Sequence, residues 1–92
     1  MNRADRIRAA IAAALQPHAL EIDDESHLHA GHSGAREGGE THYKVTVISP
    51  AFAGQSRVTR QRTVYGLLDM EFEGGLHALS LCALTPEEAA AG

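Results

Sequence analysis

The run from His42 to Ser49 constrains the fold of this 92-residue chain more than any other segment. Apolar and polar residues alternate along it, which is the pattern of a β-strand with one face in a core and the other turned outward. The apolar side consists of Tyr43, Val45 and Val47, and the polar side of His42, Lys44 and Thr46. A strand needs neighbouring strands and a covering layer, so the rest of the chain must supply both.

The N-terminal half predicts one helix and one strand. Residues 3–16 form a helix, because their apolar side chains recur at helical spacing until Pro17 stops the pattern. The buried stripe of this helix is Ile7, Ile11 and Leu15. Leu20 and Ile22 then alternate with acidic residues, which predicts a short, half-exposed strand.

The C-terminal half predicts a helix, a strand and a short terminal helix. Ser56 is suited to cap a helix that ends at Gly74, with an apolar stripe of Val58, Tyr65, Leu68 and Phe72. Residues 77–83 alternate as a third strand, which places Cys82 on the face opposite His77 as a small buried residue. A stub of helix follows Pro86.

The element order is therefore helix, strand, strand, helix, strand. We expect residues 1–92 to form one two-layer α+β domain, in which both main helices cover one face of a three-stranded sheet. The other face is expected to be polar or covered by a partner.

Composition excludes several functional classes. A net charge of −4 disfavours broad, nonspecific binding to nucleic acid, whose phosphates attract cationic surfaces. The single cysteine excludes an internal disulfide and a metal site with several thiolates from this chain alone. No apolar run has membrane-spanning length, so we expect no membrane association and a cytoplasmic location.

A glycine-rich stretch between Asp23 and Lys44 carries four of the six histidines, and we expect it to be a long loop. Imidazole changes charge near neutral pH and is a common metal ligand. A zinc or nickel site built from His27, His29 and His32 alone remains an alternative, although no fourth ligand is evident.

Four segments carry a family resemblance over nearly the whole chain: DDESHLHAGH, GETHYKVTVIS, FAGQSRVTRQRTVYGLL and GGLHALSLCALTP. In this order and spacing they resemble the BolA family. The resemblance implies a class II KH-like fold with a mixed three-stranded sheet and a helix-turn-helix-like segment around residues 50–73. One departure is Gln61, because many members have Arg-His-Arg where this chain has Arg60-Gln61-Arg62.

The resemblance also implies a partner and a cofactor. BolA proteins pair with monothiol glutaredoxins around a 2Fe-2S cluster that a glutaredoxin cysteine, a glutathione thiolate and two BolA ligands hold. Carried over to this chain, the histidine of the HAL motif is His77, and the second ligand is His29 or His32. Shared ligation also agrees with the composition, since one cysteine cannot bind a cluster by four thiolates.

A second reading is a DNA-binding transcriptional regulator in stress or morphology responses. Arg57, Arg60 and Arg62 near the start of the second helix, with Lys44 on the sheet, would contact phosphates. Acidic residues follow in the same helix, and residues 54–57 lack the GXXG loop of KH single-strand readers.

Enzymatic activity is not expected, and no catalytic residue is assigned. The chain has no nucleophile elbow or phosphate-binding glycine loop. The sequence leaves open which loop histidine ligates, whether the cluster is delivered or sensed, and whether the protein without cluster forms a weak homodimer.

Overall fold

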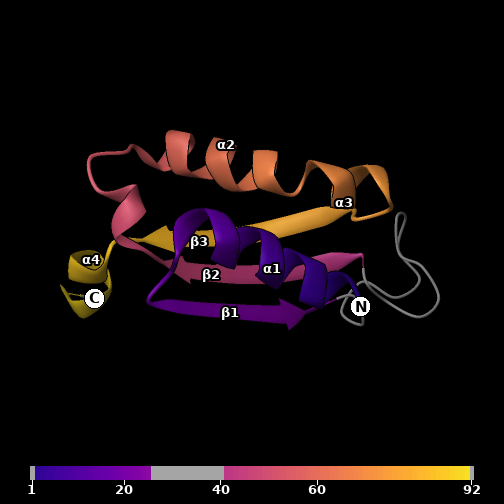
Figure 1. Ribbon diagram of the computed structural model, residues 1–92, viewed down its shortest axis with the longest axis horizontal. Coiled ribbons are helices and arrows are strands. Elements are labelled where there is room, and N and C mark those ends of the chain that lie inside the picture. The colour runs from indigo at the N-terminus through magenta and orange to yellow at the C-terminus, as the bar shows by residue number, and fades with distance from the viewer. Residues whose placement is uncertain (1, 26–40, 92) are drawn as a thin grey trace.

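The computed structural model describes residues 2–25 and 41–91 and has the expected order of helices and strands (Figure 1). Its elements are α1 (Arg3–Leu15), β1 (Ala19–Asp24), β2 (His42–Ile48), the 3₁₀ turn η2 (Pro50–Phe52), α2 (Arg57–Leu67), α3 (Asp69–Glu73), β3 (Ala78–Leu84) and α4 (Pro86–Ala91). No helix in the described ranges has the length and apolar character that crossing a bilayer requires.

The three strands form one mixed sheet with β2 in the centre. Strand β1 pairs with β2 antiparallel, with Asp24 opposite Tyr43, and β3 pairs with β2 parallel, with Ala78 opposite His42. A parallel pair requires a crossover connection, which here runs through η2, α2 and α3. The α+β class and the mixed three-stranded sheet are therefore confirmed.

Helices α1 and α2 pack on the same face of the sheet, where the hydrophobic core lies (Figure 1). The predicted apolar stripe of α1 and the predicted apolar face of β2 are buried in this core. Its remaining buried members are Phe52, Val64, Leu68, Leu76 and Leu79. Both patterns that the sequence showed clearly are thus confirmed by burial.

Local signals set both ends of α1. The Asn2 side chain accepts a hydrogen bond from the N–H of Asp5, whose carboxylate accepts one from the N–H of Asn2, forming a capping box. At the other end, Gln16 takes the left-handed conformation (φ 43°), and Pro17 prevents further helix. The buried hydroxyl of Ser49 donates to the Leu15 carbonyl oxygen at 2.7 Å, which joins this helix end to the end of β2.

The segment between residues 56 and 73 differs from the prediction in two ways. It forms two helices, α2 and α3, because the chain leaves helical geometry at Leu68. In addition, Val58 is 58% exposed, so its predicted place on a buried stripe is wrong. The buried side of α2 is instead Arg60 and Val64, continued by Leu68 at the same four-residue spacing. The predicted stripe was wrong because it was drawn through apolar residues only, whereas Arg60 occupies one of the positions on the buried side of α2.

The sheet face opposite the helices carries the alternate side chains of all three strands. The register places Asp23, Lys44 and Ser80 in one row of this open face, and Glu21, Thr46 and Cys82 in the next. Cys82 is exposed there, so the prediction of a small buried residue is wrong: alternation gave its face correctly, but none of the described helices covers that face.

Candidate functional site

His77 is exposed at the end of the sheet where β3 begins. The preceding Leu76 is buried in the core, and Gly75 at φ 123° allows the turn that leads into it from α3. The N–H groups of both His77 and Ala78 donate to the Thr41 carbonyl oxygen, at 2.8 and 3.1 Å. The backbone of His77 is therefore fixed against the residue before β2, while its imidazole remains accessible.

His42 lies beside His77, a neighbour that the sequence analysis did not identify. The two ring centroids are 5.2 Å apart, with the ring planes tilted by 51°. His42 is 7% exposed, although alternation predicted an outward position, and its Nδ1 is 2.9 Å from the Thr41 hydroxyl oxygen. Both histidines stand at the start of a predicted strand. This shared position predicts that they are neighbours only once the two strands are known to be adjacent and parallel.

The ends of the histidine-rich segment are held at the same end of the sheet. Asp24 pairs with Tyr43, and the N–H of Glu25 donates to the His42 carbonyl oxygen at 2.8 Å. The segment therefore leaves the sheet next to His42 and rejoins it at Thr41, which contacts His77. The loop histidines His27, His29 and His32 themselves lie outside the described residues.

Metal donors within the described ranges are too few for a complete site. No group of three or more His, Cys, Asp or Glu side chains there could hold a metal ion. Cys82 follows His77 by five residues along β3, which separates them by about 17 Å at the rise of a strand. The exposed His77 imidazole needs further ligands from elsewhere to hold a metal.

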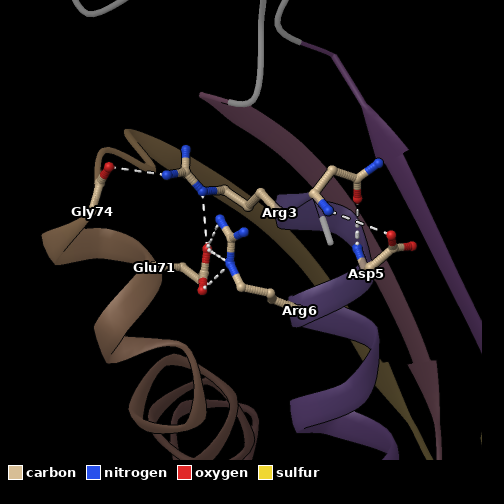
Figure 2. A network of polar contacts seen from close by, with 6 residues as sticks. Arg3, Asp5, Arg6, Glu71 and Gly74 are labelled. Carbon is tan, nitrogen blue, oxygen red and sulfur yellow. Dashed lines mark hydrogen bonds and ion pairs between the residues drawn. The ribbon is translucent and has the colours of Figure 1, made fainter.

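A network of ionic contacts supports the turn that delivers His77 (Figure 2). Arg3 of α1 donates to the Gly74 carbonyl oxygen at 3.0 Å and to the Glu71 carboxylate at 3.0 Å. Arg6 binds the same carboxylate, at 2.9 Å. Hydrogen bonds from Arg6 hold the pKa of Glu71 below its ordinary value, with a further contribution from Arg3, although burial acts in the opposite direction.

The four basic residues assigned to nucleic acid do not form one surface. Arg57 and Arg62 are exposed on α2, whereas Lys44 is on the open face of the sheet, on the opposite side from the helices.

Arg60 is 7% exposed, which corrects its assignment to an outer contact surface. It binds the Glu88 carboxylate with both terminal nitrogens, at 2.6 and 3.2 Å, and donates to the carbonyl oxygens of Gln55 and Ala83. The hydrogen bond from Arg60, helped by the Thr85 N–H, lowers the pKa of Glu88 to about 2. The guanidinium of Arg60 therefore binds groups within the protein.

Comparison with known proteins places this chain in a family. Residues 11–88 match the family described as BolA-like protein. The chain is 46% identical over 89 residues to Protein BOLA1, chloroplastic, of Arabidopsis thaliana, covering 95% of this chain and 56% of that protein. It is 42% identical over 73 residues to the DNA-binding transcriptional regulator BolA of Haemophilus influenzae, covering 79% of this chain and 67% of that protein.

A solved structure agrees with the sequence matches. The BolA domain of SufE1 from Arabidopsis thaliana superimposes with a TM-score of 0.86 at 45% identity, and covers 96% of both chains. The chain spans 24% of the full SufE-like protein 1, chloroplastic/mitochondrial, of the same plant, at 45% identity over 95% of this chain. The chain thus belongs to the BolA family, with the α-β-β-α-β fold of its solved members.

Proposed function

We propose that this protein is a non-catalytic adaptor that pairs with a monothiol glutaredoxin and glutathione to hold a shared 2Fe-2S cluster. Its role would lie in iron-sulfur cluster trafficking or in iron and redox regulation. The observation that carries the proposal is the position of His77. This accessible imidazole is fixed by its backbone to Thr41, where the segment that contains His29 and His32 rejoins the sheet.

The donor set fits shared ligation. His77 and one of the two loop histidines would supply two imidazoles, and a glutaredoxin cysteine and glutathione would supply two thiolates. Cys82 is at the wrong end of β3 to contribute. A cluster with two neutral imidazole ligands carries less negative charge than one with four thiolates, which raises its reduction potential. The neighbouring His42 would restrict the orientation of the His77 ring.

Anaerobic reconstitution tests this proposal. The chain is mixed with a monothiol glutaredoxin, glutathione, iron and sulfide, and the visible absorption and circular dichroism of the product are recorded. We expect a heterodimer spectrum distinct from that of the glutaredoxin homodimer. His77→Ala should abolish it, and the double variant His29→Ala/His32→Ala should abolish or strongly shift it.

His18→Ala is the matched control, because His18 is an exposed histidine at the opposite end of the sheet, where its N–H donates to the Ile48 carbonyl oxygen. It should leave the spectrum unchanged. An unchanged glutaredoxin homodimer spectrum with the native chain would refute shared ligation.

DNA binding is the second candidate, and the exposed Arg57 and Arg62 on α2 favour it. The similar Haemophilus influenzae protein is named as a DNA-binding transcriptional regulator. We place it second because Arg60 is bound to Glu88 and Lys44 lies on another face. Phosphate contacts by two arginines would give a shallower salt dependence than contacts by all four basic residues.

A further inference from the structure

A pocket of about 260 Å³ lies between α2 and β3. Helix α2 contributes Arg57, Arg60 and Gln61 to its lining, and β3 contributes the residues from Leu81 to Leu84. The lining residues Leu81 to Leu84 are at the C-terminal end of β3, which lies beside α4 (Figure 1), whereas His77 precedes the N-terminal end of the strand, which follows α3. The pocket is therefore separate from the histidine site.

The backbone of β3 leaves hydrogen-bonding groups at the edge of the sheet. The Ala78 N–H donates to Thr41, and the Leu84 carbonyl oxygen accepts from the Ser49 N–H, so the even-numbered residues of β3 pair with β2. The odd-numbered residues between them must direct their N–H and C=O groups away from the sheet. These residues are Leu79, Leu81 and Ala83.

Side chains of α2 occupy the two ends of this edge. The Tyr65 hydroxyl donates to the Leu79 carbonyl oxygen at 2.7 Å, and Arg60 donates to the Ala83 carbonyl oxygen at 3.0 Å. Between them, the outward N–H and C=O of Leu81 have no hydrogen-bond partner in residues 2–25 and 41–91. An unpaired edge of this kind accepts an added strand. The two capped carbonyls are about 13 Å apart, so the space admits a short segment only.

The charged residues near Leu81 indicate which side chain an added segment should carry. Arg60 is already paired with Glu88, whereas Arg57 is exposed and has no ion-pair partner among the described residues. Among the described residues, no acidic side chain lines the pocket. In a sheet, the side chain opposite Leu81 points to the same face as Leu81, which is the side where Arg57 and Gln61 lie. A carboxylate at that position would meet a guanidinium and an amide.

We propose that the β3 edge docks a short, extended, acidic peptide segment of a partner protein. Its backbone pairs with the N–H and C=O of Leu81, and the Glu or Asp opposite Leu81 binds Arg57 and Gln61. This interaction does not depend on a metal or on the histidine site, so it stands independently of the function proposed above.

A titration by NMR tests the proposal with the ¹⁵N-labelled chain and the capped peptide acetyl-Thr-Val-Glu-Val-Thr-amide. We expect saturable shifts of the Leu81 and Cys82 amide signals. Replacing Glu by Gln in the peptide, or Arg57 by Ala in the protein, should each weaken binding about fivefold, the effect of losing one charge-assisted hydrogen bond. Methylating the glutamate nitrogen of the peptide should abolish the shifts.

Arg62→Ala is the matched control, because Arg62 is an exposed arginine of the same helix that does not line the pocket. It should change the affinity by less than about twofold. His77→Ala should also have no effect, which separates this test from the cluster experiment. The proposal fails if Arg57→Ala and Arg62→Ala weaken binding equally, or if the peptide causes no shifts. It also fails if single-stranded DNA shifts these amides with a steep salt dependence and the peptide does not.

Discussion

Glu71 supports the turn before the candidate site through two arginines of α1. Its carboxylate joins two arginines of α1 to α3, and one of them, Arg3, also holds the carbonyl of Gly74 in the turn before His77 (Figure 2). Arg3 is 8% exposed, so the loss of its charged partner would leave a largely buried guanidinium with less compensation.

We expect Glu71→Gln to lower the free energy of unfolding by about 2 kcal/mol, because a charged hydrogen-bond acceptor for a buried arginine is lost. The pKa of Glu71 is lower in the folded protein than its ordinary value of 4.5. Its stabilising contribution is therefore complete above pH 4.5 and is lost as pH falls through the lowered folded value. Urea unfolding at pH 7 and at pH 3 measures both effects.

The native chain should lose more stability between these two pH values than Glu71→Gln does. The control is Glu73→Gln, an exposed neighbour in α3, which should unfold like the native chain. Equal pH dependence in native and Glu71→Gln proteins would contradict the assigned role of the carboxylate.

At the residue scale, the sequence predicted hydrophobic residues better than polar ones. The burial of Ile7, Ile11 and Leu15 followed from spacing alone, because a stripe of aliphatic side chains has one favourable environment. Alternation gave the sheet face of His42 but not its burial, and Arg60 was wrongly assigned to an outer surface, because the burial of a polar residue depends on partners that its own pattern does not show. Glu88 meets Arg60 from 28 residues away, and no local pattern predicts that pair.

At the scale of elements, Arg60 joins α2 to both β3 and α4. It donates to a carbonyl of β3, to the Gln55 carbonyl before α2 and to Glu88 of α4, and its guanidinium lies 5.7 Å from the ring centre of Phe52. Helix α4 has six residues and no buried member, so this ion pair and the Thr85 cap hold it in place. A helix this short needs such tertiary contacts.

Replacing Arg60 by Met should lower the free energy of unfolding by about 3 kcal/mol, because two partly buried carbonyl groups lose their donor although the apolar stem is retained. Arg62→Met, on the exposed side of the same helix, should change it by less than about 0.5 kcal/mol. Chemical denaturation with far-ultraviolet circular dichroism compares the two. If both variants unfold like the native chain, the contacts of Arg60 have no structural importance.

The ends of the helices show how accurately element boundaries could be predicted from the sequence. Asn2 and Pro17 bracket α1 as caps and breakers do, and the structure ends α1 within a residue of the predicted limit. The break between α2 and α3 was not predicted, although Gly66 lies two residues before Leu68. An isolated glycine is tolerated within a helix, and the apolar residues Leu68 and Phe72 continue the helical spacing across the break.

At the scale of the whole molecule, the sheet and two helices form two layers with one core between them, and no helix of residues 2–25 and 41–91 covers the other sheet face (Figure 1). Strand β2 is the most protected element, since it has a strand on each side and four buried residues. The strands predicted from alternation were all found, but their order in the sheet and the parallel pairing of β3 were not predicted, since the family resemblance implied only that the sheet is mixed.

Hydrogen exchange should reflect this arrangement. Amide protons of β2 should exchange slowest, through opening with close to the global free energy of unfolding. In β3, the N–H of Leu81 should exchange at least about tenfold faster than those of Ser80 and Cys82, which pair with β2. NMR-detected exchange measures these rates, and a Leu81 amide as slow as its neighbours would contradict the edge geometry.

The pairing of Asp24 with Tyr43 closes the β1–β2 hairpin at its base. Because the ladder itself fixes these two ends, changing the number of residues between them costs little: a doubling of a connecting loop costs only about 0.6 kcal/mol. The segment between these two ends contains the proposed ligands His29 and His32, and it could therefore be replaced by one with other donors at little cost to the stability of the fold. In the proposed site, His77 would then be the constant ligand and the second ligand could be exchanged.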